Sequence, residues 1–375
     1  MRIAFDFNPI LVNRFSGFYA FGTGLLQGFE GLEEKPEFLL FHSKRFSEQA
    51  KLVKERLGHW AQLRATSIKM RWLEKLWRYS NYPKLQYFTG DFDIYHCSHH
   101  LMPPTKNKPR ILTIYDLRRY KMPELYQKSK LHFFELALKR TDHIIAISEA
   151  TKKDLCSLFK IPDEKVDVIY MATSSTFKPV PESEKQKIKK QLTEEIGTQL
   201  ENYLVVFSSS DKRKNIPRTI EAFLRAQSRL PDNFKLVVVG NLPKDDELFK
   251  SIAFSKVANS IVITGPVEKI QNLLCCAKGL VFASLYEGFG IPILEAFACG
   301  VPVITSDCSS MPEVAGNAAL YVDPYSIESI AQAIVKVCNE VETREKLIDS
   351  GLRRLQEFSW QKTAEKTIKV YKKFL

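Results

Sequence analysis

Two glutamates flank a glycine-rich turn in the segment EGFGIPILEAFACG, residues 287–300. Glu287 opens the turn, and Glu295 lies one turn into a predicted helix that begins at Pro292, because proline is tolerated at a first helical position. Unpaired N–H groups and the positive end of the helix dipole favour an anion there, such as a phosphate or diphosphate. Carboxylates beside an anion are unfavourable unless they accept hydrogen bonds from neutral hydroxyls. The pattern therefore indicates a ligand that combines phosphate with sugar or ribose hydroxyls.

A second cluster lies in SSSDKRKNIPRTIEAF, residues 208–223, where Lys212, Arg213 and Lys214 occupy a predicted strand-to-helix loop. Lys214 is nearest to the helix start, from which an ammonium can reach a phosphate. Considered alone, the loop is equally well explained as a solvated basic surface. Because it follows a strand at the same predicted sheet edge as Glu287, we favour phosphate binding.

Short apolar runs alternate with amphipathic stretches along the whole chain. The runs are rich in β-branched and aromatic residues, as expected of parallel strands that are buried on both faces. They cover residues 2–7, 37–42, 93–97, 110–116, 143–148 and 166–171, and then 203–209, 234–240, 260–265, 279–284, 301–306 and 318–323. The alternation predicts the α/β class, with two doubly wound parallel sheets.

A charged segment with two prolines, KPVPESEKQKIKKQLTEEIG, separates the two groups of strands. We interpret it as an interdomain linker followed by a polar helix, so that a first domain covers residues 1–180. Ligands of such folds bind in a cleft at the carboxyl ends of the strands. The glycines of GTGLLQG have the spacing G-x-G-x-x-x-G, one residue longer than a dinucleotide fingerprint, which argues against a nicotinamide cofactor.

Several motifs together resemble one enzyme family. EGFGIPILEAFACGVPVI and the following SDCSSMPEVAGNAALYVDP resemble the donor-binding segment of family-4 retaining glycosyltransferases of the GT-B fold, group 1. RKNIPRTIEAF resembles the family's phosphate-lysine segment, and ILTIYDL and TDHIIAISEATKKDL resemble strand ends of its first domain. The opening IAFDFNPI and FSGFYAFGTGLL resemble its first strand, glycine loop and helix, so the resemblance covers nearly the whole chain.

The resemblance implies two Rossmann-like domains that face a central cleft. Residues 1–180 would bind the acceptor, residues 181–358 the nucleotide sugar, and a closing helix, 359–375, would cross back onto the first domain. The mechanism implied is transfer without an enzyme-bound intermediate. The acceptor hydroxyl attacks on the face from which the nucleoside diphosphate leaves, and a leaving phosphate oxygen takes its proton. The protein then positions the reactants and stabilises charge.

The resemblance also implies roles for the matching residues. Lys214 and Arg213 would contact the donor diphosphate, Glu287 the hydroxyls of the donor sugar, and Glu295 the ribose hydroxyls. The expected donor-binding set is Gly17, Ser209, Arg213, Lys214, Glu287, Gly288, Phe289, Gly290, Ile291 and Glu295. The expected catalytic residues are Glu287, Lys214, Tyr115 and Asp116, and the expected acceptor-side residues are Phe18, His99, His100 and Arg118.

Two positions depart from the family pattern. Ser208 stands where the family often has an arginine, a change shared with mannosyltransferase-like members. Tyr115 stands where a histidine is common, and a tyrosine can hydrogen-bond a sugar hydroxyl but carries protons poorly at neutral pH. Asp116 is retained. Gly17 would pass close to the phosphates, where a side chain would clash.

A metal-dependent mechanism is not expected, and no cofactor is expected beside a GDP- or UDP-sugar donor. Asp91-Phe92-Asp93 is a D-x-D triplet, but it only precedes a predicted strand, and GT-B enzymes do not generally need it. His96 and Cys97 point to opposite faces of that strand, which disfavours a zinc site.

The net charge of +12 is a local feature of the chain. Residues 1–180 contain 29 Lys and Arg against 19 Asp and Glu, and residues 51–140 alone contain 19 against 7. Within this part, residues 59–88 combine three tryptophans with five Lys and Arg of the stretch 64–78, and Met70, Leu73, Leu76 and Trp77 have the spacing of a helix core. This segment is either a helix with a solvated basic face or a surface that sits on anionic lipid headgroups. No nucleic-acid motif accompanies it, so no nucleic-acid partner is expected.

Three further features bear on the compartment. The seven cysteines form no C-x-x-C pair, which favours a reducing environment. The N-terminal MRIAFDF begins directly as a strand without a visible signal peptide, and no apolar run reaches the roughly 18 residues of a spanning helix. We expect a cytoplasmic protein, peripheral on the inner face of the plasma membrane.

These observations predict a retaining hexosyltransferase that uses a nucleotide-diphosphate sugar, with mannose from GDP-mannose favoured. The acceptor would be a hydroxyl of a lipid-linked or lipopolysaccharide-type glycan. The alternatives are a GT-B sugar-nucleotide epimerase, a soluble glucosyltransferase with a small acceptor, and a non-catalytic basic protein that binds glycan or lipid on the same scaffold.

Overall fold

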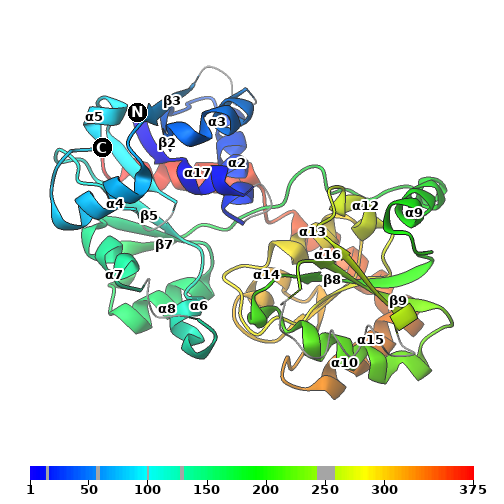
Figure 1. Ribbon diagram of the computed structural model, residues 1–375. Helices are drawn as coiled ribbons and strands as arrows, with labels where there is room; N and C mark the ends of the chain where they lie inside the picture. The colour runs from blue at the N-terminus through cyan, green and yellow to red at the C-terminus, as the bar shows by residue number, and fades with distance from the viewer. Residues whose placement is uncertain (14–16, 56–59, 99–100, 127–130, 243–257) are drawn as a thin grey trace. The chain divides into compact units, whose positions relative to one another are not determined.

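The computed structural model describes residues 1–13, 17–55, 60–98, 101–126, 131–242 and 258–375. The chain forms two compact units, each built on one parallel sheet with helices packed against it (Figure 1). Unit 1 comprises Met1–Ala172 and Phe358–Leu375, and unit 2 comprises Thr173–Glu357. Each sheet is covered by apolar side chains of its flanking helices and forms the core of its unit.

The sheet of unit 1 has seven parallel strands in the order β3-β2-β1-β4-β5-β6-β7. Its strands are β1 (Arg2–Asp6), β2 (Glu37–Ser43), β3 (Ala61–Thr66), β4 (Ile94–Cys97), β5 (Arg110–Ile114), β6 (His143–Ala146) and β7 (Val166–Val168). Its helices are α1 (Asn8–Val12), α2 (Gly17–Glu30), α3 (Ser47–Lys54), α4 (Met70–Tyr79), α5 (Gln86–Thr89), α6 (Arg118–Lys121), α7 (Leu131–Arg140), α8 (Glu149–Phe159) and α17 (Trp360–Lys372). The strand order reverses direction between β1 and β4, as in a Rossmann sheet.

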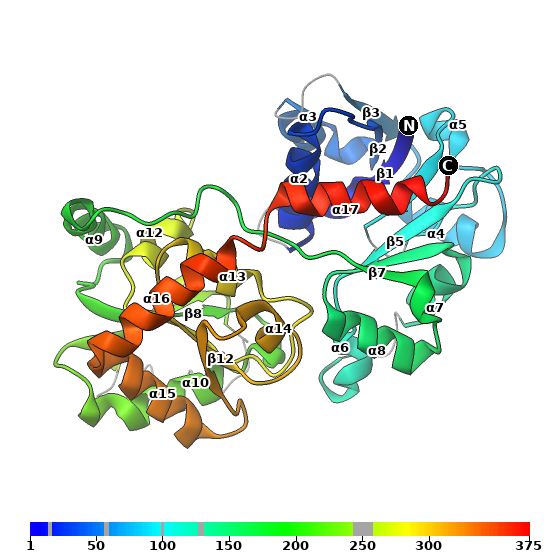
Figure 2. The same cartoon turned by 180° about the vertical axis from the view of Figure 1, so that it is seen from behind.

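The helix α17 lies along α2 on unit 1, although hundreds of residues separate the two in sequence (Figure 2). Glycines of α2 make this close approach possible. A Cβ on Gly28 would lie 2.1 Å from the carbonyl oxygen of Trp360, and one on Gly24 would lie 2.1 Å from the Trp360 ring. The GTGLLQG segment is therefore a helix-packing surface.

A buried hydrogen-bonded histidine also ties α17 to the sheet. The Nδ1 atom of His96 lies 2.6 Å from the Tyr371 hydroxyl, and its Nε2 atom lies 2.7 Å from the Thr113 hydroxyl. Burial lowers the pKa of His96 to about 3, so its ring is neutral. Both ring nitrogens have partners within the core, which explains this histidine without a metal.

The sheet of unit 2 has six parallel strands in the order β10-β9-β8-β11-β12-β13. They are β8 (Asn202–Ser208), β9 (Phe234–Gly240), β10 (Ile261–Gly265), β11 (Gly279–Phe282), β12 (Val303–Ser306) and β13 (Ala319–Val322). The helices are α9 (Glu182–Ile196), α10 (Ile216–Ala226), α12 (Ile270–Cys275), α13 (Ile291–Ala298), α14 (Met311–Ala315), α15 (Ile327–Asn339) and α16 (Val341–Leu355). The order reverses between β8 and β11, so the segments that follow these two strands meet at one edge of the sheet.

The twelve predicted strands are present with shifted ends, and the structure adds a thirteenth. The strand β3, AQLRAT, lies at the edge of the unit 1 sheet and carries polar side chains, so it lacks the continuous apolar character used to recognise strands. The following α4 confirms the predicted helix, with Leu73 and Trp77 buried. Leu76 has the helical spacing of a core residue, but 45% of its surface is exposed.

Candidate functional site

The two sequence motifs of unit 2 meet at the carboxyl ends of β8 and β11. Lys214 ends a short 3-10 helix, η5 (Lys212–Lys214), that follows β8, and Glu287 lies in the turn after β11. The Lys214 Nζ atom lies 2.7 Å from Glu287 Oε1, and Arg213 Nη1 pairs with Glu287 Oε2. The Lys214 ammonium also lies 4.7 Å from the centre of the Phe282 ring. One carboxylate is thus held between two cations.

This ion-pair cluster is largely removed from water, with 7% of Glu287 and 8% of Arg213 exposed. Burial alone would raise the pKa of the Glu287 carboxyl, but the charges of Lys214 and Arg213 outweigh it and lower that pKa to about 2. Burial also lowers the pKa of Lys214, while Glu287 acts in the opposite direction. The close pairing keeps both groups ionised. Asp211 also pairs with Arg213, so two carboxylates balance the two cations of the cluster.

Arg213 is fixed by contacts on three sides. Its Nε atom donates to Asp211 Oδ2 at 3.1 Å, and its Nη1 atom donates to the carbonyl oxygen of Tyr286 at 2.8 Å. Its own carbonyl oxygen accepts the N–H of Leu285 at 2.8 Å. These bonds join η5 directly to the turn after β11 and hold the guanidinium rigidly.

Two serine hydroxyls shape the turn that holds Glu287. Ser310 Oγ lies 2.9 Å from the Glu287 carbonyl oxygen and 2.8 Å from that of Phe289. Ser309 Oγ donates to the Glu287 carbonyl oxygen at 2.5 Å and accepts the Glu287 N–H at 3.2 Å. Neither serine was predicted from the sequence, although the SS pair of SDCSSMPE directly precedes a helix, where such hydroxyls often bind backbone.

Asn215 is a second structural residue that was not predicted from the sequence. It adopts a left-handed conformation, φ 58°, at the start of α10. Its amide donates to the carbonyl oxygens of Ala283 at 2.9 Å and Pro324 at 2.7 Å. The signal was available in KRKN, since asparagine is among the residues that tolerate this conformation.

The helix α13 begins at Ile291 after Gly290, whose φ of 110° strongly favours glycine. Glu295 projects from the first turns of this helix and is half-buried. Burial raises the pKa of its carboxyl to about 7, against a smaller lowering by the charge of Lys214. Within the described residues, its carboxylate has no hydrogen-bond partner, so it is available to a ligand.

The remaining predicted donor residues of unit 2 lie around this cluster. Phe289 is buried and Ile291 is half-buried at the turn and helix start. The Ser209 hydroxyl accepts the N–H of Asp211 at 3.2 Å, and that of Ser208 donates to the carbonyl oxygen of Asn241 at 3.0 Å. The structure thus brings the predicted residues Ser209, Arg213, Lys214, Glu287, Gly288, Phe289, Gly290, Ile291 and Glu295 to one edge of the unit 2 sheet.

In unit 1, Tyr115 follows β5 and is enclosed by aromatic rings. Its ring centre lies 4.6 Å from that of Phe18 and 5.2 Å from that of Phe21. Its hydroxyl is buried, and burial, with further effects of Cys97 and Asp6, raises its pKa well above the usual value. A phenol of this kind stays protonated at neutral pH, so the Tyr115 hydroxyl is not a proton acceptor there.

The other unit 1 predictions lie near the carboxyl ends of its strands. Asp116 accepts the N–H of Arg118 at 3.3 Å and forms an ion pair with it at 3.6 Å. A Cβ on Gly17 would meet no described atom within 4 Å, so packing does not require glycine at that position. His99 and His100 lie outside the described residues.

The D-x-D triplet is engaged in structural contacts. Asp93 Oδ2 accepts the N–H of Arg2 at 2.7 Å, and Asp91 forms an ion pair with Lys108 at 3.7 Å. Both aspartates precede β4, so they lie at the amino end of that strand. Among the residues that the structure describes, no three His, Cys, Asp or Glu side chains gather as a metal site.

Comparison with protein families agrees with this arrangement of fold and site. The model described as "Glycosyl transferases group 1" matches residues 188–354, and the model described as "Glycosyltransferase Family 4" matches residues 42–174. Together they cover most of both units. The chain belongs to the group 1, family-4 glycosyltransferases and has the GT-B fold, as the sequence predicted.

Individual relatives match all or about two thirds of the chain. O-antigen chain mannosyltransferase B of Escherichia coli is 26% identical over 385 residues, which cover 99% of this chain and 100% of that protein. O-antigen chain mannosyltransferase RfbU of Salmonella typhimurium is 28% identical over 64% of this chain and 63% of that protein. The crystal structure of Anabaena Alr3699/HepE in complex with UDP and glucose superposes with a TM-score of 0.73, 17% identity and 99% coverage of each chain.

The helices give one further result. Among those that the structure describes, each is too short or too polar to cross a lipid bilayer.

Proposed function

We propose that this glycosyltransferase transfers mannose from a nucleoside-diphosphate mannose, GDP-mannose being favoured, to a hydroxyl of a lipid-linked or lipopolysaccharide-type glycan. The observation that supports it most directly is the Lys214–Glu287–Arg213 cluster at the switch point of the unit 2 sheet. Mannose and the glycan acceptor are supported by the relatives, which are O-antigen chain mannosyltransferases. Ser208, in place of the arginine that the family often has, points the same way.

The donor would bind by an exchange of partners. Lys214 and Arg213 are already oriented by buried contacts, and a diphosphate offers them more negative charge than one carboxylate does. When the diphosphate takes these cations, Glu287 is freed to accept hydrogen bonds from hydroxyls of the donor sugar. The N–H groups near Gly288 and Gly290 and the positive end of α13 add to the anion site.

Glu295 would bind the ribose. Its carboxylate is half-buried and has no hydrogen-bond partner among the described residues, as expected of a group that awaits hydroxyl donors. Two ribose hydroxyls satisfy a carboxylate without adding negative charge to the helix. This assigns the two glutamates to different hydroxyl-bearing parts of one ligand.

The transfer would retain the configuration of the anomeric carbon. The acceptor hydroxyl attacks on the side from which the nucleoside diphosphate departs, and an oxygen of the departing phosphate takes the acceptor's proton. Lys214 and Arg213 stabilise the charge that develops on that phosphate. The raised pKa of Tyr115 fits this scheme, because the scheme requires no protein base.

Unit 1 would position the acceptor. Phe18 and Tyr115 form an aromatic surface of the kind that packs against sugar rings, and Asp116 with Arg118 adds polar groups. Gly17 lacks a packing reason to be glycine, which suits close approach of a ligand. A lipid-linked acceptor would place the enzyme on the inner face of the plasma membrane as a peripheral protein.

A donor panel tests the proposal. GDP-mannose, GDP-fucose, UDP-glucose and UDP-N-acetylglucosamine are each incubated with a lipid-linked glycan acceptor, and the product linkage is read from its anomeric NMR coupling. We expect mannose transfer with retention. An altered sugar nucleotide without any acceptor would identify an epimerase, transfer only to small soluble acceptors would identify the soluble glucosyltransferase, and binding without turnover would identify a non-catalytic protein.

The variant Glu287→Gln links this activity to the site. It removes the negative charge that opposes a diphosphate, so the nucleoside diphosphate should bind at least as tightly while transfer falls about 100-fold. Glu342→Gln is the matched control, since Glu342 is exposed and pairs with Lys346 on the surface of α16. Transfer by Glu287→Gln at the wild-type rate would reject the assignment.

A further inference from the structure

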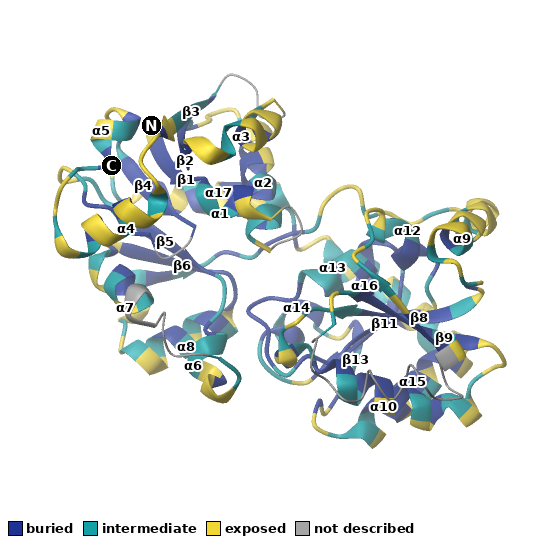
Figure 3. Cartoon of the chain, viewed as in Figure 1, coloured by how far each residue is buried: buried dark blue, intermediate teal, exposed yellow. Residues whose placement is uncertain are grey.

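The helix α4 of unit 1 carries apolar side chains on two of its sides, one buried and one exposed. Leu73 and Trp77 are 0% and 1% exposed and pack into the core of unit 1. Trp72, Leu76 and Tyr79 are 55%, 45% and 77% exposed, and their spacing puts them along one stripe of the helix. Exposed residues mark much of this helix in Figure 3. Burial of Leu73 and Trp77 accounts for one side only.

Four cations interrupt the exposed stripe. Lys69, Arg71, Lys75 and Arg78 lie in or next to α4, whereas Glu74 is its one acidic residue. The Arg71 guanidinium and the Lys75 ammonium each lie 5.9 Å from the Trp72 ring centre. Glu74 is half-buried and lines a pocket on the inner side of the helix. We call the exposed side chains of Lys69, Arg71, Trp72, Lys75, Leu76 and Tyr79 the α4 surface.

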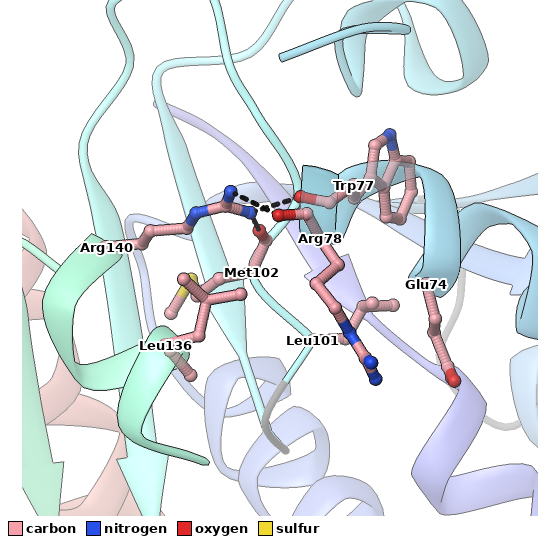
Figure 4. Close-up of a pocket in the computed structure, with 8 residues that line it drawn as sticks. Glu74, Trp77, Arg78, Leu101, Met102, Leu136 and Arg140 are labelled. Atoms are coloured by element: carbon pink, nitrogen blue, oxygen red, sulfur yellow. Dashed lines mark hydrogen bonds between the residues drawn. The ribbon is translucent and has the colours of Figure 1, made fainter. Parts of the chain in front are cut away.

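The inner side of α4 is firmly anchored, as Figure 4 shows. Arg140, at the end of α7, donates to the carbonyl oxygens of Trp77, Arg78 and Met102. A cation there satisfies carbonyl groups at the end of the helix and complements its dipole. The pocket beneath has a volume of about 30 Å³, room for a few water molecules and too small for a sugar nucleotide.

The same character continues beyond the helix. Tyr82 and Tyr87 are 59% and 62% exposed, and their ring centres lie 5.4 Å apart. The Lys106 ammonium lies 5.8 Å from the Tyr87 ring centre. The indole N–H of Trp77 donates to the carbonyl oxygen of Pro83 at 2.8 Å, which ties this loop to α4. Exposed aromatic rings with nearby cations therefore extend past the end of α4.

We propose that the α4 surface binds the headgroup region of an anionic lipid bilayer. Trp and Tyr rings with Leu side chains insert at the boundary of headgroups and acyl chains, and Lys and Arg bind lipid phosphates. Charge complementarity supports this partner, because residues 51–140 hold 19 Lys and Arg against 7 Asp and Glu. The exposed apolar stripe favours lipid over nucleic acid. A nucleic acid would be bound by the cations alone and would not require the apolar stripe.

The location of α4 suits the proposed function. The lipid-binding inference rests on that function, because a lipid-linked acceptor gives the enzyme a reason to bind a bilayer. The Trp77 ring centre lies 6.3 Å from that of Phe41, near the carboxyl end of β2. Phe18 and Tyr115 lie near the carboxyl edge of the same sheet. A bilayer on the α4 surface would therefore contact the same unit that carries Phe18 and Tyr115.

Flotation of the full chain with vesicles tests the proposal. Vesicles of phosphatidylcholine containing one third phosphatidylglycerol should carry the protein upward, and pure phosphatidylcholine vesicles should carry much less. Removing one cation near an anionic surface lowers the affinity for vesicles about fivefold. The double variant Arg71→Glu with Lys75→Glu should therefore lower this affinity by about twentyfold or more. Lys187→Glu with Lys190→Glu, exposed on α9, changes the net charge equally and should leave binding within about twofold.

A fluorescence measurement places Trp72 itself in the bilayer. Brominated lipids in the anionic vesicles should quench part of the wild-type tryptophan emission. Trp72→Phe should lose this quenching, because Trp77 is buried and Trp60 and Trp360, both half-buried, are outside the α4 surface. Trp72→Ala should also lower vesicle binding about tenfold. Circular dichroism and thermal unfolding of each variant check that the fold is intact.

The outcomes separate this inference from the proposed function. Equal flotation with neutral and anionic vesicles, or wild-type flotation of the α4 variants, would overturn the lipid surface. So would release of the wild-type chain from vesicles by a DNA duplex that the α4 variants fail to bind. Mannose transfer to a short soluble glycan should be unchanged in the α4 variants, and its absence in every variant alongside normal flotation would overturn only the proposed function.

Discussion

In the free protein Glu287 is paired with Lys214 and Arg213, whereas in the proposed complex these two cations bind the diphosphate instead. Without ligand it neutralises part of the charge of Lys214 and Arg213 and keeps them in place. Two buried cations without a carboxylate partner would be strongly unfavourable. The carboxylate thus keeps a cationic site folded and ready while no phosphate is bound.

The role of Lys214 in binding the diphosphate can be tested with Lys212, in the same short helix, as the control. Lys214→Met should weaken nucleoside-diphosphate binding about thirtyfold, equivalent to ~2 kcal/mol for a charge-assisted hydrogen bond. Lys212→Met is the control, because Lys212 belongs to the same short helix but is exposed. Isothermal titration measures both. Equal affinities of the two variants would show that Lys214 does not contact the ligand.

Glu295 predicts a pH dependence of nucleotide binding. Burial raises its pKa to about 7, so the carboxyl is largely protonated below pH 7 and ionised above it. If the ionised form accepts the ribose hydroxyls, affinity for the nucleoside diphosphate should decrease as the pH falls from 8 to 6. Titrations across this range measure the decrease. Glu295→Gln should bind with a much flatter pH profile, and an identical profile would contradict the assignment.

The same group affects stability with a defined sign. Its folded-state pKa lies above the ordinary value of 4.5, so the folded protein holds this proton more tightly than the unfolded chain does. The free energy of unfolding should therefore fall as the pH rises from about 4.5 to 7 and change little from this source above 7. Thermal unfolding of Glu295→Gln should lack that component and so show a smaller loss.

At the scale of residues, the sequence identified groups that act through charge. Lys214, Arg213, Glu287 and Glu295 were recognisable because charged side chains beside glycine turns and helix starts are typical of phosphate and hydroxyl binding. Their mutual pairing was not recognisable, because it depends on the order of strands that brings β8 beside β11. Ser309, Ser310 and Asn215 act through backbone contacts, and such contacts leave only a weak signal in a single sequence.

Among the elements, α2 and α17 depend most clearly on individual residues. Gly28→Ala would place a methyl group 2.1 Å from the Trp360 carbonyl oxygen, and backbone cannot yield easily. We expect a loss of about 1–3 kcal/mol in the free energy of unfolding, as for other overpacked sites. Gly31→Ala is the control, since its nearest atom outside the neighbouring residues lies at 3.9 Å. Urea unfolding of both variants measures the difference, and equal stabilities would contradict the close packing.

Elements were predictable where their environment is uniform. Strands buried on both faces are apolar throughout, so twelve were found, although their ends shifted by a few residues. The edge strand β3 has mixed polarity because one of its sides lacks a partner strand among the described residues, and it was missed. Leu76 has the spacing of a core residue and is nevertheless exposed, because periodicity finds an apolar residue on a helix but does not show which side meets water.

Over the whole molecule, the excess of basic residues and the proposed diphosphate site belong to different units. The proposed diphosphate site in unit 2 uses Lys214 and Arg213, whereas residues 1–180 hold most of the basic excess. The D-x-D triplet belongs to unit 1 and is bound to Arg2 and Lys108. The local distribution of charge, more than its total, therefore indicates the partners.

This distribution predicts a transfer reaction that does not depend on a divalent metal. In the proposed complex, the two cations Lys214 and Arg213 would neutralise the diphosphate in place of a metal, so added EDTA should leave the transfer rate unchanged. Asp91→Asn should do the same, because it removes only a surface ion pair with Lys108 at 3.7 Å. Radiolabelled sugar transfer measures both. A rate that EDTA abolishes and Mg²⁺ restores would contradict this prediction.

The return of α17 to unit 1 also has a consequence for how the protein is made. Unit 2 is an insertion within unit 1, because residues 173–357 lie between two parts of the same body. Unit 2 can fold as soon as it is synthesised, whereas unit 1 must wait for residues 358–375 to cover α2 and to supply Tyr371 to His96. A chain that ends at residue 357 would thus have a complete second unit, whereas its first unit would retain an uncovered face.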